Sequence, residues 1–360
     1  MRKVKKVKKE TGIETEIAAI SEENLIPAWS MIELTHRCNL KCSHCYLASG
    51  ESEQREEREV NKVGEEKKEL TTKEVKNILD QLAEAGCLFL AFTGGEMFLR
   101  KDIWEILEYA SEKRFAVTVL TNATLLKQDD IKKLKKMNIH ELSTSLYSLK
   151  AEVHDGVTGV KGSYVKVIKA LKEIKKAGIA VRIKTPLMMC NYSEKKAITK
   201  FAKKNGFKML FDPVLAPKND GSTGNTKQKI GTAVLGKVVK QHCSDWSYSN
   251  KYLERNVICS AGKNFVAVNP YGEVLSCLQI PVSAGNLRKK KFDKIWRNSA
   301  VLKKIRGMKL GDLKECENCK DIRYCNRCPG LALLENGSLY GRSNSACQIA
   351  TIRSRYGSKK

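Results

Sequence analysis

The first 210 residues alternate between short apolar runs and longer segments whose apolar side chains recur every three or four positions. The short runs are typical of β-strands covered on both faces, and the longer segments predict amphipathic helices. We predict strands at 32–34, 87–92, 115–120, 141–147, 180–187 and 207–213. We predict helices at 70–86, 102–113, 129–137, 163–178 and 193–206.

Six strands with five helices between them indicate parallel strands joined by right-handed crossovers. A complete barrel needs eight such units, so we expect an α/β fold with an open, partial (β/α)6 TIM-like barrel. Polar or glycine-rich sequence follows several strands, for example TGGE at 93–96 and TNAT at 121–124. In parallel barrels the chemistry gathers at these carboxyl ends of the strands.

The pattern changes after residue 215. Residues 216–229 have the composition of a linker, and 265–278 predicts two strands around an Asn-Pro-Tyr-Gly turn. Phe292–Arg306 predicts one helix, and closely spaced cysteines with few apolar runs follow, as in small domains ordered by metal. We expect a basic extension at 1–30, the barrel at 31–215 and a connecting segment at 216–254. A small cysteine-rich domain at 255–350 and a tail at 351–360 follow.

The formal net charge is +26 at pH 7. Such a charge suits an acidic partner, but many lysines fall at helix-surface positions and are not interleaved with aromatic residues. We therefore favour solvated helix faces and expect no nucleic-acid partner. No stretch approaches the ~20 apolar residues of a spanning helix, and the basic start lacks a signal-peptide core, so we expect a soluble, cytoplasmic protein. The charged, aperiodic residues 50–69 are either a lid or a solvated insertion.

Thirteen cysteines in a reducing compartment indicate metal binding or catalysis rather than disulfides. Cys38, Cys42 and Cys45 lie together after the first predicted strand, with no fourth cysteine close by. Three thiolates leave one coordination position open. A catalytic zinc with three cysteine ligands fits this pattern, and so does a [4Fe–4S] cluster with one iron that the protein does not ligate.

The CxxxCxxC spacing, the β/α series and the GGE after the second strand together resemble the radical S-adenosylmethionine (radical SAM) superfamily over about residues 30–215. The resemblance implies a [4Fe–4S] cluster on these three cysteines, whose open iron binds the amino and carboxylate groups of S-adenosylmethionine. The cluster cleaves this cosubstrate to a 5′-deoxyadenosyl radical, which abstracts hydrogen from the substrate. A reductant such as flavodoxin or ferredoxin is implied as a partner.

The resemblance also implies contacts with S-adenosylmethionine. The adenine is expected to contact His44 and Tyr46, and the methionine ammonium Gly94, Gly95 and Glu96. The nucleoside is expected to contact Asn122 and Ser145, and the methionine carboxylate Lys184. Arg182 shares a strand face with Lys184 and is the alternative for the carboxylate. Taken without the resemblance, His44 fits a zinc ligand, GGE a tight turn, and Asn122 and Ser145 turn or cap residues. No residue stands out as a catalytic acid or base.

Seven further cysteines resemble the SPASM domain that follows the radical SAM domain in many maturases, over about residues 255–350. The implied auxiliary [4Fe–4S] clusters are held by Cys316, Cys319, Cys325 and Cys347 and by Cys259, Cys277 and Cys328, with Cys243 as a candidate fourth ligand of the second. Only Asn326 and Arg327 stand where the family commonly has three residues. Spacing alone also allows structural zinc on CENC and CNRC. Cys87 and Cys190 are expected to be buried packing residues.

Enzymes with these two domains mostly modify ribosomally made peptides or proteins, so the resemblance implies such a substrate. The stretch SLYS…HDGVTGVKGSY also resembles one seen in many peptide maturases. The alternative is a tetrapyrrole enzyme of haem or haem d1 biosynthesis with the same two domains. A non-catalytic iron–sulfur or zinc scaffold that binds nucleic acid would require the GGE, Asn122 and Ser145 to be accidental.

Overall fold

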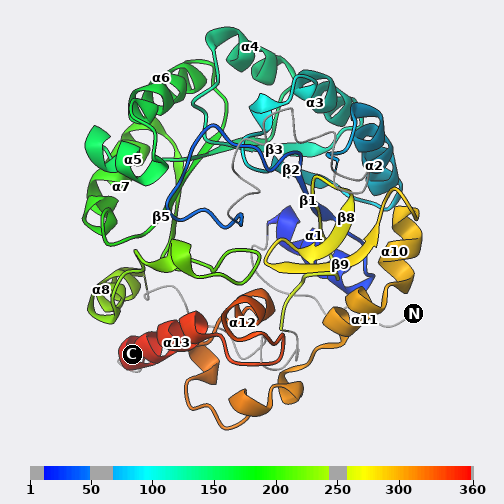
Figure 1. Ribbon diagram of the computed structural model, residues 1–360, viewed down its shortest axis with the longest axis vertical. Helices are drawn as coiled ribbons and strands as arrows, with labels where there is room; N and C mark the ends of the chain where they lie inside the picture. Colours follow the sequence, from blue (N-terminus) through cyan, green and yellow to red (C-terminus); the bar gives the residue numbers. More distant parts are fainter. Residues whose placement is uncertain (1–11, 49–67, 243–257, 358–360) are drawn as a thin grey trace.

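The computed structural model describes residues 12–48, 68–242 and 258–357. Most of the charged insertion and the candidate ligand Cys243 lie outside the described residues. One nine-stranded sheet runs through the molecule in the order β6-β5-β4-β3-β2-β1-β7-β8-β9. Its first part curves into a barrel with helices around its outer face (Figure 1).

The six barrel strands are parallel, as the sequence predicts. They are β1 (Trp29–Glu33), β2 (Phe89–Thr93), β3 (Ala116–Thr121), β4 (Glu141–Ser145), β5 (Val181–Pro186) and β6 (Lys208–Asp212). The helices between them are α2 (Thr72–Glu84), α3 (Ile103–Glu112), α4 (Gln128–Lys136), α5 (Ala151–Thr158), α6 (Ser163–Lys176) and α7 (Lys195–Asn205). The α/β partial barrel is therefore confirmed.

The crossover from β4 to β5 contains two helices where the sequence predicts one. The additional helix is α5, which buries His154, Val157 and Thr158. Two of these three side chains are polar, so α5 lacks the apolar stripe by which a helix is detected from sequence. The prediction of five intervening helices is wrong for this reason.

Local sequence signals account for the well-predicted helices. At the start of α2, Thr71 and Glu74 form a reciprocal capping box. The apolar stripe of α2 packs on the sheet through Ile78, Leu79 and Leu82, against Leu90 and Phe92 of β2, in one continuous core. These elements carry their own start signal and burial pattern, so the sequence is sufficient to place them.

The strands predicted around the Asn-Pro-Tyr-Gly turn are β7 (Phe265–Val268) and β8 (Glu273–Cys277), followed by β9 (Ile280–Asn286). They do not form a separate sheet. β7 pairs in parallel with β1, with Phe265 opposite Trp29, so the C-terminal region continues the sheet of the barrel (Figure 1). The cysteine-rich part is thereby attached to the first barrel strand through backbone hydrogen bonds.

The single helix predicted at 292–306 is two helices, α10 (Phe292–Asn298) and α11 (Ala300–Gly307). Ser299 between them has extended backbone, with φ −58° and ψ 125°. Asn and Ser bond readily to nearby backbone and are weak helix formers, so the pair at 298–299 permits the break. Each short helix then buries its own face, with Trp296 on α10 and Leu302 on α11.

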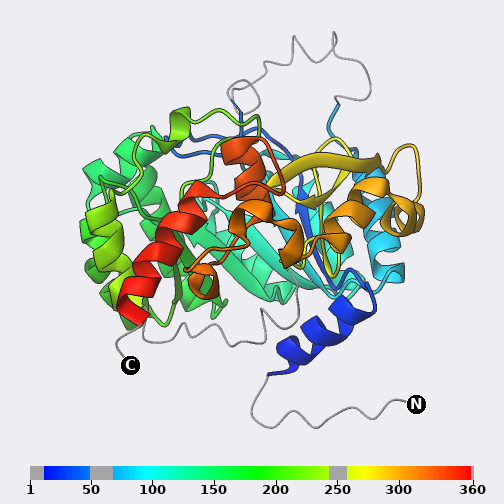
Figure 2. The ribbon, with the colours of Figure 1, turned by 90° about the horizontal axis from the view of Figure 1, so that it is seen from below.

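The remaining described helices lie outside the barrel units. They are α1 (Ile13–Glu23), α8 (Thr232–His242), α12 (Pro329–Asn336) and α13 (Asn344–Gly357). α13 packs beside α8, and an apolar cluster that includes Leu235, Val239 and Ile349 joins them (Figures 1 and 2).

The two cysteines outside the cysteine groups differ in burial. Cys87 is buried as expected, but the expectation for Cys190 is wrong: it is exposed, because it lies in the turn after β5. Among the described helices, none is long and apolar enough to cross a membrane.

Candidate active site

A cavity of about 920 Å³ lies at the carboxyl ends of the barrel strands. One wall is the loop that carries the first three cysteines, residues 38–45, which we call the cysteine loop. The other walls come from the ends of β2 to β5 and from the segment after β6, at Thr93–Gly95, Leu120–Asn122, Ser143–Ser145 with Tyr147, Lys184, Lys218 and Gly224–Asn225. Residues from six distant parts of the sequence thus line one space, where a parallel barrel places its chemistry.

The two glycines of TGGE support the backbone that leads into the cysteine loop. A Cβ atom at Gly94 would lie 2.3 Å from the carbonyl oxygen of Thr35, and one at Gly95 would lie 2.3 Å from that of Arg37. The amide nitrogens of Gly95 and Glu96 donate to the same two carbonyls, at 2.7 and 2.8 Å. Only residues without a side chain permit this contact, which we call the glycine clasp.

The HDGVTG stretch supports the cysteine loop from another side. The carbonyl oxygens of Val157 and Thr158 accept hydrogen bonds from the backbone of Ser43 and Lys41, at 3.0 and 2.8 Å. Gly159 then turns with φ 67°, and a Cβ there would lie 2.9 Å from the Lys41 carbonyl. The stretch that resembles peptide maturases therefore positions the cysteine loop in this structure.

Glu96 is fully buried beneath the cavity and is not among the residues that line it. Its carboxylate accepts hydrogen bonds from the backbone nitrogen of Asn122, at 2.8 Å, and from the Thr121 hydroxyl, at 2.9 Å. Burial raises the pKa of Glu96 to about 7, although these hydrogen bonds oppose the rise. In the described residues Glu96 joins β2 to β3, and its predicted contact with the methionine ammonium stays a prediction.

Asn122, Ser145 and Lys184 all line the cavity. The Asn122 amide donates to Asn39 of the cysteine loop at 2.9 Å. Ser145 and Lys184 lie opposite each other in the β4–β5 register. Arg182, the alternative to Lys184, instead makes a two-bond ion pair with Glu141, at 2.6 and 3.0 Å, and does not line the cavity. The geometry therefore favours Lys184 for an anion in this space.

His44 and Tyr46 also line the cavity. The His44 ring packs edge-on against Tyr147, with 5.0 Å between centroids, and burial lowers its pKa to about 4, so it is neutral at pH 7. The Tyr46 hydroxyl donates to the carboxylate of Glu33, and its carbonyl accepts from the backbone nitrogen of Asn219 at 2.8 Å. Both side chains are held by the protein, and their contacts with adenine stay predictions.

The segment at 216–226, whose composition resembles a linker, is a wall of the site. The amide of Asn225 donates to the carbonyls of Cys45 and Ala216, at 3.1 and 3.0 Å, and Lys218 faces the cavity. Asn225 is separated from Cys45 by 180 positions. Sequence reasoning missed these residues because polar, glycine-containing sequence carries no periodic signal for a packed loop.

Two family models match the chain. The model of the radical SAM superfamily matches residues 32–203, and the model of an iron–sulfur cluster-binding domain, SPASM, matches residues 259–329. The chain belongs to the radical SAM superfamily and carries a SPASM domain.

Individual relatives agree with this assignment. The chain is 28% identical to an AdoMet-dependent heme synthase of Methanosarcina barkeri, over 89% of this chain and 95% of that protein. It is 29% identical to the antilisterial bacteriocin subtilosin biosynthesis protein AlbA of Bacillus subtilis, over 90% of this chain and 71% of that protein. The fold matches Streptococcus suis SuiB bound to S-adenosylmethionine with a TM-score of 0.69 and 20% identity, covering 93% of this chain and 81% of SuiB.

Membership assigns the cofactors of this radical SAM enzyme. The radical SAM domain binds a [4Fe–4S] cluster and S-adenosylmethionine, and the SPASM domain binds auxiliary iron–sulfur clusters. The cysteine loop fits such a group, because burial, together with neighbouring negative charges, raises the pKa of Cys42 to about 12 and that of Cys38 to about 11. Thiolates in such a place require a strongly positive centre.

The SPASM cysteines gather in two groups. Cys259, Cys277 and Cys328 act on one another electrostatically and form the three-cysteine group. The same holds for the four-cysteine group of Cys316, Cys319, Cys325 and Cys347. This partition is the one that the family resemblance implies, and the assignment of individual ligands remains a proposal.

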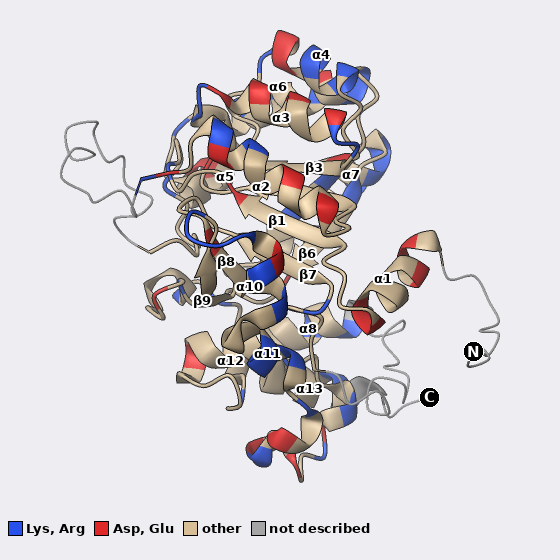
Figure 3. Ribbon diagram, turned by 90° about the vertical axis from the view of Figure 1, so that its right-hand side faces the viewer, with Lys and Arg blue, Asp and Glu red and all other residues tan. Residues whose placement is uncertain are grey.

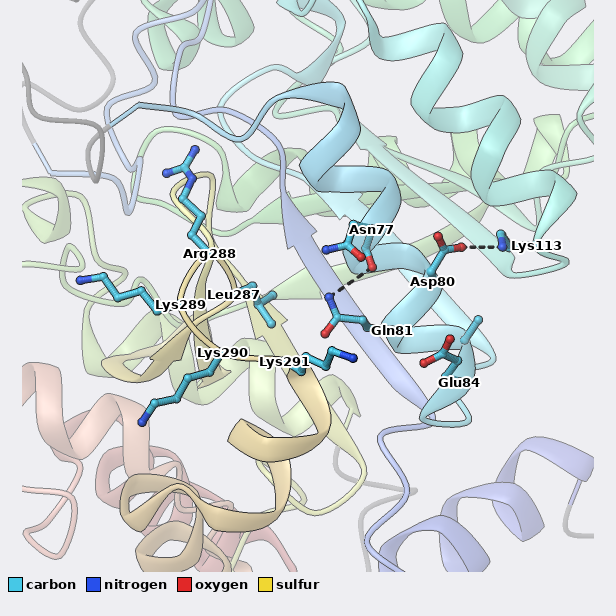
Figure 4. A pocket seen from close by; sticks show the side chains of 11 residues that line it. Asn77, Asp80, Gln81, Glu84, Lys113, Leu287, Arg288, Lys289, Lys290 and Lys291 are labelled. Carbon is cyan, nitrogen blue, oxygen red and sulfur yellow. Dashed lines mark hydrogen bonds and ion pairs between the residues drawn. The ribbon is translucent and has the colours of Figure 1, made fainter.

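A second hollow of about 620 Å³ lies between α2 and the turn after β9, away from the cysteine loop (Figure 4). Acidic side chains of α2, such as Asp80 and Glu84, face basic ones of Lys289–Lys291 across it. Asp80 is already paired with Lys113, and the hollow contains no cysteine. Elsewhere the basic residues occupy separate segments of α4, α7, α10 and α11, while α1 carries acidic residues (Figure 3).

Proposed function

We propose that this radical SAM enzyme abstracts a hydrogen atom from a residue of a ribosomally made peptide or protein and thereby installs a post-translational modification. When bound, the cluster and S-adenosylmethionine supply the 5′-deoxyadenosyl radical for this step. The protein's part is to hold both groups in the cavity, direct one substrate position toward them and exclude water.

The cysteine loop performs the first of these tasks. Cys38, Cys42 and Cys45 hold the cluster, and the glycine clasp and the α5 contacts fix the loop from two sides. Because the backbone is held by hydrogen bonds that need no metal, these three cysteines would present a bound cluster to the cavity. The proposed ligands of S-adenosylmethionine line the same cavity.

Lys184 provides a test of this arrangement that does not need a substrate. Lys184 lines the cavity, and burial lowers its pKa, that is, disfavours its charged form. The methionine carboxylate suits this position because a nearby anion restores the charged form. We expect Lys184→Met to weaken binding of S-adenosylmethionine roughly 10–100-fold, as for loss of a charged hydrogen bond of about 1.5–3 kcal/mol.

The measurement is calorimetric titration of the reconstituted enzyme, with iron content determined in parallel. Lys208→Met is the matched control, since Lys208 lies on the next strand and pairs with Glu141 but does not line the cavity. Equal affinities in wild type and Lys184→Met at full iron content would remove Lys184 from the site.

The size of the cavity carries the argument for a peptide. About 920 Å³ is the volume of a pocket for one drug-sized ligand, and the cluster and S-adenosylmethionine share it with the substrate. The remaining space suits a single side chain that enters while the rest of its chain stays outside. AlbA, named for bacteriocin biosynthesis, and SuiB, solved with its precursor peptide SuiA, support this substrate class.

The decisive experiment is co-expression with short peptides encoded beside this protein, followed by mass spectrometry. A mass change on one peptide that disappears with Cys42→Ala supports the proposal. If no neighbouring peptide changes mass while 5′-deoxyadenosine is produced at full iron content, the peptide proposal fails and the radical SAM assignment stands.

A tetrapyrrole substrate is the second candidate. The Methanosarcina barkeri heme synthase aligns over 95% of its own length. Among the described residues that line the cavity, Lys41, Lys184 and Lys218 are basic and none is acidic, which also suits carboxylate side chains of a porphyrin. Incubation with a carboxylate-bearing iron porphyrin distinguishes the two, because loss of its carboxylates during turnover favours this candidate.

A further inference from the structure

Arg327 lies where the two groups of SPASM cysteines meet. It stands between Cys325 of the four-cysteine group and Cys328 of the three-cysteine group. Three residue steps span at most roughly 11 Å, so the two sites adjoin each other at this point of the chain. The position is also the one where the spacing is a residue shorter than the family commonly shows.

The guanidinium is anchored on a backbone segment that lies near both groups. Nη2 donates to the carbonyl oxygens of Leu339 and Gly341, the latter at 2.7 Å. Leu339 shares one apolar cluster with Cys316 and Cys259 and another with Cys259 and Cys277. The Arg327 side chain is therefore anchored on a segment that packs in the same clusters as cysteines of both groups.

Two donors of this guanidinium have no acceptor. Arg327 is 7% exposed, and its Nε and Nη1 atoms are buried without a hydrogen-bond partner among the described residues. Each unsatisfied buried donor costs about 1–3 kcal/mol, and more when it is charged. The positive charge of Arg327 acts on Cys316 and Cys325 of the four-cysteine group and on Cys328 of the three-cysteine group. Cysteine sulfurs become negative acceptors once they ligate iron.

We propose that Arg327 donates through Nε and Nη1 to sulfurs of the two auxiliary clusters and raises their reduction potentials. Net charge and hydrogen bonds to the sulfurs set such potentials, and a buried cation favours the reduced, more negative form. Arg327 would thus make these clusters better electron acceptors through its charge and its hydrogen bonds. This inference rests on the assignment of the seven cysteines to two clusters and is independent of the substrate.

The test is a redox titration of the full-length, reconstituted enzyme, followed by electron paramagnetic resonance. We expect Arg327→Met to lower the potential of an auxiliary cluster by about 59 mV, a tenfold change for one electron, and to leave the first cluster unchanged. Arg342→Met is the control, since Arg342 bonds to the Glu315 carbonyl but is 61% exposed and screened by water. Its shift should be much smaller.

Unchanged auxiliary potentials in Arg327→Met at full iron content overturn the proposal, and so do equal shifts in Arg327→Met and Arg342→Met. If Arg327→Met loses auxiliary iron, Arg327→Lys decides. Recovery of the iron by lysine, which keeps the charge, supports the electrostatic role. Loss of iron in Arg327→Lys as well assigns the residue to its bonds with Leu339 and Gly341 and overturns the proposal.

Discussion

The cysteine loop and the C-terminal cysteines differ in what holds them. The loop at 38–45 follows a central strand. The TGGE turn bonds to the backbone that leads into the loop, the end of α5 bonds to the loop itself, and Leu40 in the loop and Leu47 just after it are buried. The cysteines at 316–328 lie among short 3-10 turns, at Leu310–Asp312, Lys314–Cys316 and Ile322–Tyr324, over two small apolar clusters. The hydrogen bonds that hold the first site need no metal, whereas we expect the second region, built of short turns, to depend on its clusters for order.

Removing the glycine clasp should have the largest effect. Gly95→Ala places a Cβ 2.3 Å from a backbone oxygen that belongs to a fixed segment, so the cysteine loop must move. We expect loss of about one cluster's worth of iron and a fall of at least roughly 100-fold in 5′-deoxyadenosine formation, as expected when about 3 kcal/mol of loop stability is lost.

Gly156→Ala is the matched control, because nothing lies within 4 Å of a Cβ there. Iron content, labile sulfide and 5′-deoxyadenosine are measured in both variants. A Gly95→Ala enzyme with full iron and wild-type turnover would mean that the clasp does not position the loop.

Removing metal should separate the two regions next. After chelation under anaerobic conditions, we expect hydrogen exchange in 310–328 to accelerate roughly tenfold or more, because short turns over small clusters open easily. Strands β1 to β5 should keep their protection, since one continuous core covers them. The comparison is made by mass spectrometry of peptic peptides from the same sample. Equal loss of protection in β1 and in 310–328 would contradict the difference drawn here.

The smallest expected effect is the change in the free energy of unfolding with pH that the titration of Glu96 causes. Its pKa is about 7 in the folded protein and 4.5 in the unfolded chain, so the folded state retains a proton that the unfolded chain releases in this range. The free energy of unfolding therefore falls as pH rises from about 4.5 to 7. Glu96→Gln cannot titrate, so its stability relative to wild type should rise by on the order of 2–3 kcal/mol from about pH 5 to pH 8.

Thermal unfolding of both proteins without S-adenosylmethionine measures this difference. Glu105→Gln, which changes an exposed carboxylate on α3, is the matched control for replacing a glutamate by glutamine. A constant difference between Glu96→Gln and wild type across this range would place Glu96 in a more polar environment than the fold shows.

The sequence by itself determined the order of the barrel strands, most helices, and the three cysteine positions with their open coordination site. These features depend on local signals: apolar periodicity, the Thr71–Glu74 capping box, and the spacing of Cys38, Cys42 and Cys45. The errors in the predicted helices also have local causes, because α5 has no apolar stripe and the break at Ser299 has only a weak propensity signal.

The tertiary structure alone decided which distant residues meet. It brought Gly95 beneath Arg37, placed Asn225 against Cys45 across 180 positions, and extended the barrel sheet from β1 into β7. It also buried two donors of Arg327, near cysteines of both groups, that find no acceptor in the part of the chain that the structure describes. Such contacts form between segments that are each unremarkable alone, because close backbone approach and desolvation arise only when the packed chain brings them together.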